Sequence, residues 1–121
     1  MPIGRRFAAV LLAAVLGTSG CASRQAYTAR PLATDEHAAV RERIRVEAKT
    51  YCGSCHQSSL PTAKPAALAI YDLDRDDWAT MLTPARLQNG FPRRLNARLD
   101  AQGREQLRRF IEAELALRTA R

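Results

Sequence analysis

The pentapeptide Cys52-Gly53-Ser54-Cys55-His56 constrains this chain more than any other feature of its sequence. Two thiols at this spacing lie one turn apart on a helix, and a histidine that follows the second thiol projects from the same end. The C-x-x-C-H spacing is typical of covalent haem attachment, in which both thiols bond to the porphyrin and the histidine binds iron. We therefore expect Cys52 and Cys55 to hold one haem c through thioethers, with His56 as the proximal iron ligand.

Pairs of cysteines at this spacing also occur in thiol-redox sites, disulfides and zinc sites, so these alternatives stay open. A structural zinc site takes four ligands, and beyond Cys52, Cys55 and His56 the sequence offers only the distant His37. A thioredoxin-like site follows a strand, whereas the residues before Cys52 have helical periodicity. Haem is the favoured interpretation, and a thiol-redox or zinc module is the less favoured one.

Residues 1–20 have the order of a secretory signal peptide. Arg5 and Arg6 form its charged region, residues 7–17 form its apolar region, and small residues follow. The apolar run is shorter than the about 20 residues that cross a bilayer. We expect an exported bacterial protein that is not an integral membrane protein.

The segment that ends the signal, Thr18-Ser19-Gly20-Cys21, resembles the lipobox of bacterial lipoproteins, although leucine is more usual at the position of Thr18. The resemblance implies that Cys21 is lipidated and anchors the chain to the periplasmic side of a membrane. The alternative is cleavage after Ala22, which would release a soluble periplasmic protein. Lipid on Cys21 and haem on the other two would use all three cysteines of the chain.

The expected organisation is a signal peptide over 1–20, a flexible tether over 21–34 and a haem domain over 35–121. Within the domain, a helix capped by Thr34 is predicted over 35–56, since apolar or small residues recur at helical spacing. These residues are Val40, Ile44, Ala48, Tyr51 and Cys55.

Beyond His56, prolines and small polar residues predict a loop over 57–64. Pro65 is expected to open a short helix through Tyr71. Asp74 or Asp76 could cap a helix that carries Trp78, Met81 and Leu82.

A further helix is expected to begin at Thr83-Pro84 and to end at Asn89-Gly90. An amphipathic last helix is predicted from Asp100 onward, with its apolar positions at Leu107, Phe110, Ile111, Leu115 and Leu117. No segment alternates with a period of two, so an all-α domain of three to five helices is predicted.

The charges of the chain sum to +7 and are segregated along the sequence. The acidic block consists of Asp72, Asp74, Asp76 and Asp77. The basic residues that follow it are Arg93, Arg94, Arg98, Arg104, Arg108 and Arg109. No nucleic-acid motif accompanies the positive charge, and export argues against nucleic acid as a partner. The resulting dipole could orient the domain toward a redox partner, although solvated helix faces would have the same pattern.

Taken together, these features resemble the monohaem class I c-type cytochromes over residues 35–118. The shared features are a helix ending in the pentapeptide, a proline-bearing loop, short middle helices and an amphipathic last helix. The resemblance implies that the first and last helices cross beside the haem, and that a proline carbonyl, of Pro61 or Pro65, faces the second nitrogen of His56. It also implies single-electron transfer between redox proteins, such as a membrane oxidase or dehydrogenase.

The distal iron ligand in that family is usually a methionine, and Met81 is the one methionine after the signal peptide. A methionine beside Trp78 on an amphipathic helix is equally suited to core packing. His37, otherwise a surface residue, and Lys64 are lesser candidates. Without a distal ligand, the haem would be five-coordinate and suited to binding small ligands, or it would serve as an accessory group of a larger oxidase. No nucleophile–base pair or paired carboxylates are evident, so no enzyme is expected.

Overall fold

The computed structural model describes residues 32–121, and most of this part is helical, with no strand in it. The all-α prediction is therefore confirmed for this range. In chain order the elements are α1 (Thr34–His56), α2 (Pro65–Leu68), α3 (Trp78–Met81), the π-helical turn η1 (Arg86–Gly90), α4 (Phe91–Asn96) and α5 (Ala101–Thr119). The predicted signal peptide, Cys21 and most of the tether lie outside the described residues. Within 32–121, no helix is both long and apolar enough to cross a membrane.

The long helix α1 has the apolar face that its periodicity predicts over most of its length. Val40, Ile44 and Ala48 are buried, as expected. Tyr51 is 46% exposed, so its predicted place on that face is wrong. The predicted cap is also wrong, because the helix begins one residue earlier at an Ala33 N-cap that forms no side-chain hydrogen bond.

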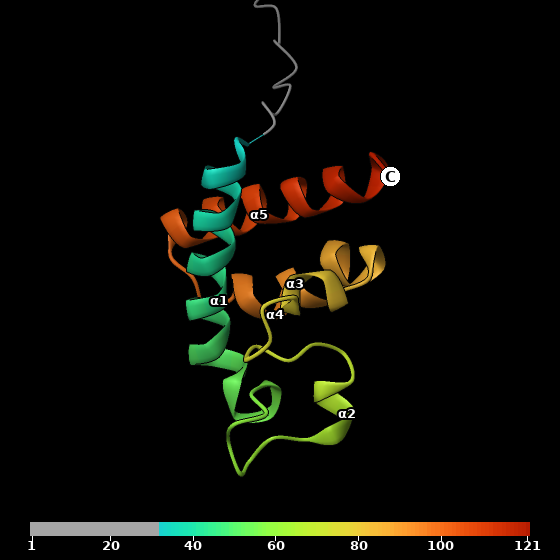
Figure 1. Cartoon of the computed structure of the whole chain (residues 1–121). Coiled ribbons are helices and arrows are strands. Elements are labelled where there is room, and N and C mark those ends of the chain that lie inside the picture. The colour runs from blue at the N-terminus through green and yellow to red at the C-terminus, as the bar shows by residue number, and fades with distance from the viewer. Residues whose placement is uncertain (1–31) are drawn as a thin grey trace, which may run out of the picture.

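The last helix, α5, crosses α1 and covers its buried face (Figure 1). Asp100 caps it as predicted, since Asp100 Oδ1 accepts a hydrogen bond of 2.7 Å from the backbone N–H of Gly103. Leu107 and Phe110 are buried in the core, whereas Leu117 is 47% exposed. The amphipathic pattern therefore predicts the first part of the helix well and its end less well.

In the middle of the chain, the end of α2 and the N-cap of α3 differ from the prediction. Pro65 opens α2 as expected, but the helix ends at Leu68 and does not reach Tyr71. The N-cap of α3 is Asp77 and its side chain makes no cap, so neither predicted aspartate has that role.

The predicted stop at Asn89-Gly90 is also absent, because η1 continues directly into α4. Phe91 and Leu95 of α4 are buried, and this burial favours a continued helix over the local preference of Gly90 for a turn.

Aromatic side chains from four parts of the chain meet in the core. Trp78 stacks on Phe110 with ring centroids 5.4 Å apart, and Phe91 lies 6.0 Å from each of them. Tyr71 meets Phe91 edge-on at 5.7 Å. Because aromatic pairs at these separations attract each other, they connect α3, α4 and α5 to the segment that contains Tyr71.

A buried carboxylate joins α1 to α5, and it was not expected from the sequence. Glu114 of α5 is 1% exposed, although carboxylates are rarely buried unless they are paired. Its Oε1 accepts hydrogen bonds from His37 Nε2 at 2.9 Å and from Arg41 Nε at 2.8 Å. His37 is therefore partly buried and bonded within the fold, and the prediction of a surface residue is wrong.

Arg118 extends this contact to α3. Its Nη1 lies 3.4 Å from Glu114 Oε2, and its Nη2 donates hydrogen bonds to the carbonyls of Ala79 and Leu82 at 2.8 and 3.0 Å. These carbonyls lie at the C-terminal end of α3, where helical partners are lacking. Arg118 thus donates hydrogen bonds to carbonyls at the end of α3 and also lies close to the buried carboxylate of Glu114.

Candidate functional site

The pentapeptide forms the last turns of α1, with both thiols available for bonding. Cys52 and Cys55 lie one helical turn apart, both are partly exposed, and neither forms a disulfide. Gly53 between them is buried. The helix therefore presents two thiols on adjacent turns and ends at His56, as the sequence predicts.

The loop after the motif returns to satisfy the end of α1. The backbone N–H of Lys64 donates to the carbonyl of Cys55 at 3.1 Å, and that of Leu73 donates to the carbonyl of His56 at 2.7 Å. The last carbonyls of a helix have no partner within it. Here the returning chain supplies those partners, which fixes the loop against the motif.

His56 is held by a backbone carbonyl of the same returning segment. Its Nδ1 lies 3.0 Å from the carbonyl oxygen of Tyr71. A carbonyl can only accept, so Nδ1 carries the proton and Nε2 of the neutral ring keeps its lone pair. The carbonyl belongs to neither Pro61 nor Pro65, and the prediction of a proline carbonyl at this position is wrong.

Tyr71 makes two further contacts with the motif. Its ring stacks on the imidazole of His56, with centroids 3.8 Å apart and planes 3° from parallel. Its phenol lies close enough to the thiol of Cys52 to interact with it electrostatically. Burial, followed by the nearby thiol of Cys52, raises the pKa of the Tyr71 phenol far above its usual value, so the phenol stays protonated.

Side chains of α1 hold the segment that contains Tyr71. Arg45 Nε donates to the carbonyl of Leu73 at 2.7 Å, and Lys49 Nζ lies 3.2 Å from Asp74 Oδ1. Both contacts come from the turns of α1 that precede the motif. The segment is thus attached to the same helix that carries the thiols.

Two aspartates hold the other side of the loop. Asp72 Oδ1 accepts from the N–H groups of Ser58 and Asp74, and Asp74 Oδ2 accepts from the N–H of Ser59 at 2.9 Å. Burial opposes ionisation of Asp72, but hydrogen bonds from Ser58 and the Asp74 amide outweigh it and lower its pKa. The Ser59 side chain and then its amide hold the pKa of Asp74 far below the usual range. Asp72 is buried, so the acidic block is not wholly a solvated face.

The structure places the other ligand candidates away from the motif or in other roles. His37 lies nineteen residues before His56 in the same helix, roughly 28 Å along its axis, and is bonded to Glu114. Lys64 is exposed in the loop. Met81 is partly buried at the end of α3 and packs against the core, as the packing alternative predicts; iron binding by Met81 stays a prediction.

The donor set fits a covalently held haem better than a metal cluster. Within residues 32–121, no three histidine, cysteine or acidic side chains are grouped so that they could hold a metal ion. A thioether-bound haem needs only two free thiols and one imidazole nitrogen from this part of the site. Cys52, Cys55 and Nε2 of His56 meet that requirement, and no hydrogen bond among the described residues occupies Nε2.

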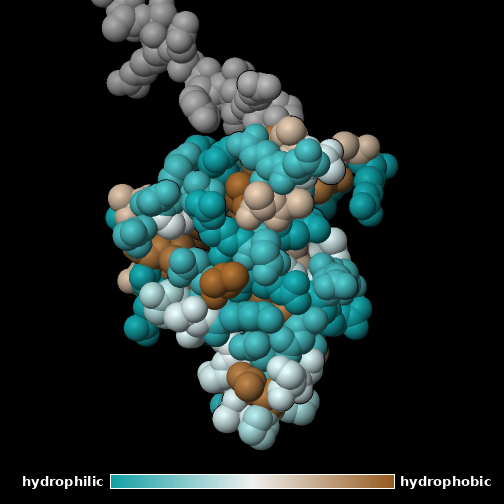
Figure 2. Space-filling model, turned by 60° about the vertical axis from the view of Figure 1, so that its left-hand side comes forward, coloured by the Kyte–Doolittle hydropathy of each residue, from teal (hydrophilic) through white to brown (hydrophobic). Residues whose placement is uncertain are grey.

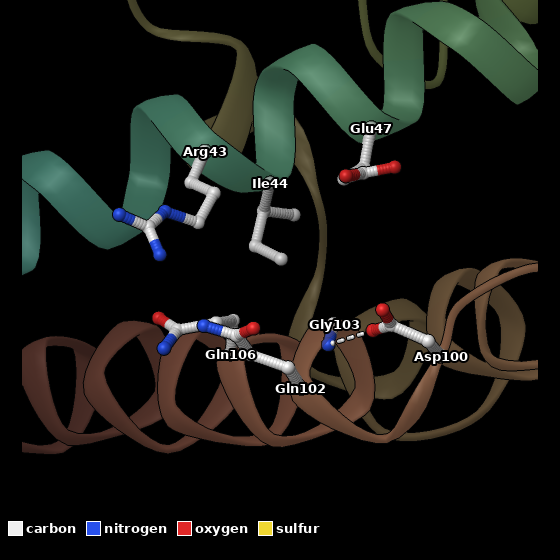
Figure 3. Close-up of a pocket in the computed structure, with 7 residues that line it drawn as sticks. All are labelled: Arg43, Ile44, Glu47, Asp100, Gln102, Gly103 and Gln106. Atoms are coloured by element: carbon white, nitrogen blue, oxygen red, sulfur yellow. Dashed lines mark hydrogen bonds between the residues drawn. The ribbon is translucent and has the colours of Figure 1, made fainter.

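A separate surface pocket of about 230 Å³ lies between α1 and α5 (Figure 3). None of the motif residues lines this pocket. Most of its lining residues are polar: Arg43, Ile44, Glu47, Asp100, Gln102, Gly103 and Gln106. Side chains from the two helices face each other across the gap, with charges of both signs. It is not part of the thiol and imidazole site.

The segment between α3 and α5 carries exposed positive charge that is not paired with carboxylates of residues 32–121. The segment from Trp78 to Leu99 has four arginines and no aspartate or glutamate: Arg86, Arg93, Arg94 and Arg98. All four are exposed, and no carboxylate in residues 32–121 forms an ion pair with them. Arg94 is close enough to Tyr71 to act on its phenol electrostatically.

The face drawn in Figure 2 is mainly hydrophilic, with apolar side chains in small separate patches. Among the described residues, the large exposed apolar side chains are Val46, Tyr51, Leu60 and Leu117. Of these, Tyr51 and Leu60 lie close in sequence to the motif, on either side of it.

No family model, no curated protein and no solved structure matches this chain. Function is therefore inferred from the residues of the site.

Proposed function

We propose that this protein is a monohaem c-type cytochrome that carries single electrons on the periplasmic side of a bacterial membrane. The observation that carries the proposal is the state of His56 at the end of α1. Its Nδ1 is engaged by the Tyr71 carbonyl, while Nε2 is left for a metal and two free thiols lie within the preceding turn. Metal-bound histidines commonly have their second nitrogen engaged in this way.

The residues of the chain would perform three tasks. Cys52 and Cys55 would hold the haem covalently, each through a thioether formed from its free thiol. The imidazole of His56 binds through Nε2, and its Nδ1–H donates to the carbonyl that fixes its tautomer. A bound haem would supply an iron that accepts and releases one electron. The protein carries the electron and catalyses no reaction of its own.

Lipidation of Cys21 would hold this domain near the membrane where its redox partners lie. The partners we propose are a membrane oxidase or dehydrogenase, without nucleic acid. The exposed, unpaired arginines between residues 86 and 98, of which Arg94 acts on Tyr71, favour a partner with an acidic surface, since opposite charges speed the encounter.

A second candidate function is a five-coordinate haem that binds a small ligand. The packing of Met81 against the core favours it, because a methionine held there is occupied by apolar contacts. The two candidates differ in the oxidised spectrum. A methionine-to-iron charge-transfer band that disappears in Met81→Ala supports the carrier, whereas a high-spin spectrum that changes with carbon monoxide supports the ligand-binding protein.

Covalent haem is tested by mass and by spectrum on the exported full chain. The purified protein should have the mass of the processed chain plus one haem, and should keep its haem stain on a denaturing gel. Replacing both Cys52 and Cys55 with alanine should abolish the stain. Cys21→Ser is the matched control, because it should release the protein from the membrane while leaving the haem attached. A wild-type protein without added haem mass would refute the proposal.

A further inference from the structure

Tyr71 contacts the proposed iron ligand in two ways at once, and this sets it apart from the other residues of the loop. Its carbonyl restrains one atom of His56, namely Nδ1 at 3.0 Å. Its ring covers the imidazole face at 3.8 Å and within 3° of parallel. The first contact sets the direction in which Nδ1 points, and the second sets the plane of the ring.

Each contact alone would leave the imidazole partly free. The torsion that rotates a histidine ring has broad energy wells, so a single hydrogen bond permits a range of ring planes. A flat ring in parallel contact removes much of that range, since rotation would bring imidazole atoms into the phenol. The two contacts together define one orientation.

Tyr71 is itself fixed, so it can impose this orientation. It is 6% exposed, and Phe91 meets its ring edge-on at 5.7 Å. Two residues further on, the N–H of Leu73 donates to the carbonyl of His56 at the end of α1, and the carbonyl of Leu73 accepts from Arg45. Displacing the phenol would require breaking contacts on its edge and along its neighbouring backbone.

We propose that Tyr71 is a positioning residue for His56, whose stacked ring sets the imidazole plane and thereby the electronic state of the iron that His56 would bind. The inference rests on the proposed haem site. The plane of an axial imidazole determines which iron orbitals it overlaps, so a fixed plane gives one defined set of ferric g values. A ring free to rotate gives shifted or multiple sets.

The test compares electron paramagnetic resonance spectra of the oxidised holoprotein in three variants. Tyr71→Leu removes the stacked ring, and its largest g value should shift or split into several. Tyr71→Phe keeps the ring and loses only the hydroxyl, so it should restore the wild-type g values. Phe110→Leu is the matched control, since it removes a buried ring that stacks on Trp78 and contacts Phe91 but, among the described residues, makes no ring contact with Tyr71 or His56. It should lower the melting temperature and leave the g values unchanged.

The wild-type protein provides a second measurement in case Tyr71→Leu does not fold. Nuclear Overhauser contacts between the ring protons of Tyr71 and His56 should be observed in the reduced holoprotein. Their absence would overturn the inference, as would equal g shifts in Tyr71→Leu and Phe110→Leu. Unchanged g values in Tyr71→Leu would overturn it while leaving the haem proposal intact. A wild-type chain that carries no haem by mass would overturn both.

Discussion

Glu114 is the residue whose single charge supports the most contacts in the fold. It is buried, and three cationic or ionisable side chains surround it: His37, Arg41 and Arg118. Removing one partner of a buried ion pair leaves the others without compensation. We expect Glu114→Ala to lower the free energy of unfolding by about 3 kcal/mol, measured by chemical denaturation.

The control for this prediction lies half a turn away on the same helix. Glu112 pairs with Arg108 at 2.6 Å, and the two side chains are 42% and 39% exposed. Exposed pairs of this kind contribute about 1 kcal/mol or less. If Glu112→Ala and Glu114→Ala were equally destabilising, the buried network would not have the role assigned to it.

At the level of single residues, the sequence predicts the C-x-x-C-H motif but not the residue that contacts and orients His56, which is Tyr71. Cys52, Cys55 and His56 are adjacent in sequence, so their spacing alone indicates their chemistry. Tyr71 lies fifteen residues from His56 in a stretch without periodicity, and no local pattern indicates that the chain returns there. Glu114 was missed for another reason: it lies seven residues after Leu107 and four after Phe110, on the apolar face of α5, but no local pattern shows that its charge is paired across the crossing with α1.

Among the elements, the junction of η1 and α4 offers a direct test of helix continuity. Gly90 has helical angles, with φ −76° and ψ −56°, and an added Cβ would meet no atom within 4 Å. Alanine costs less conformational entropy in a helix than glycine does. Gly90→Ala should therefore raise the free energy of unfolding by roughly 0.5–1 kcal/mol.

Gly103 in α5 is the contrasting position for this substitution. There an added Cβ would lie 3.1 Å from Leu99 Cβ and 3.3 Å from Asp100 Oδ1, which is tight. Gly103→Ala should stabilise less than Gly90→Ala or should destabilise. A destabilised Gly90→Ala would indicate that the helical turn at residue 90 is not maintained in solution.

The lowered pKa of Asp74, in the loop after the motif, predicts how the free energy of unfolding changes at acidic pH. The pKa of Asp74 is lower in the folded chain than its unfolded value of about 3.9. Ionised Asp74 therefore stabilises the fold above about pH 4, and this contribution is lost as the pH falls toward the folded pKa. Asp74→Asn should flatten the acid side of a plot of unfolding free energy against pH. An unchanged acid side would contradict the assigned hydrogen bonds.

Periodicity predicted the elements where the core face is continuous. It identified α1 and the start of α5, because Val40, Ile44, Leu107 and Phe110 recur at helical spacing and are buried. It failed at Asn89-Gly90, where local turn preference indicated a stop and burial of the following residues extended the helix. Short helices such as α3 depend on tertiary contacts, including those of Arg118, which no local pattern contains.

For the whole molecule, we expect the unpaired arginines of α4 and of the turn that follows it to affect the rates at which charged redox reagents react with the protein. Replacing Arg93, Arg94 and Arg98 together with glutamine should slow oxidation by the anionic reagent ferricyanide several-fold at low ionic strength. The effect should fade as salt screens the charges. Stopped-flow absorbance would measure the rates on haem-loaded protein.

Two controls test this explanation: an oxidant of opposite charge, and the replacement of an arginine at another position. A cationic oxidant should react faster with the triple variant, not more slowly. Arg75→Gln changes an exposed arginine that is already paired with Asp77, so it should have little effect. A uniform loss of rate with both reagents would point to a damaged site and would refute the electrostatic explanation.

The crossing of α1 and α5 also has a consequence for the order of folding. It joins His37 to Glu114 across 77 residues, whereas His56 and Tyr71 are separated by 15. Closing the longer loop costs more chain entropy, so local contacts are expected to form first. The motif and its returning loop should gain protection before α5 docks, as pulsed hydrogen exchange would detect. Haem could then be attached while the C-terminal helix is still unpacked.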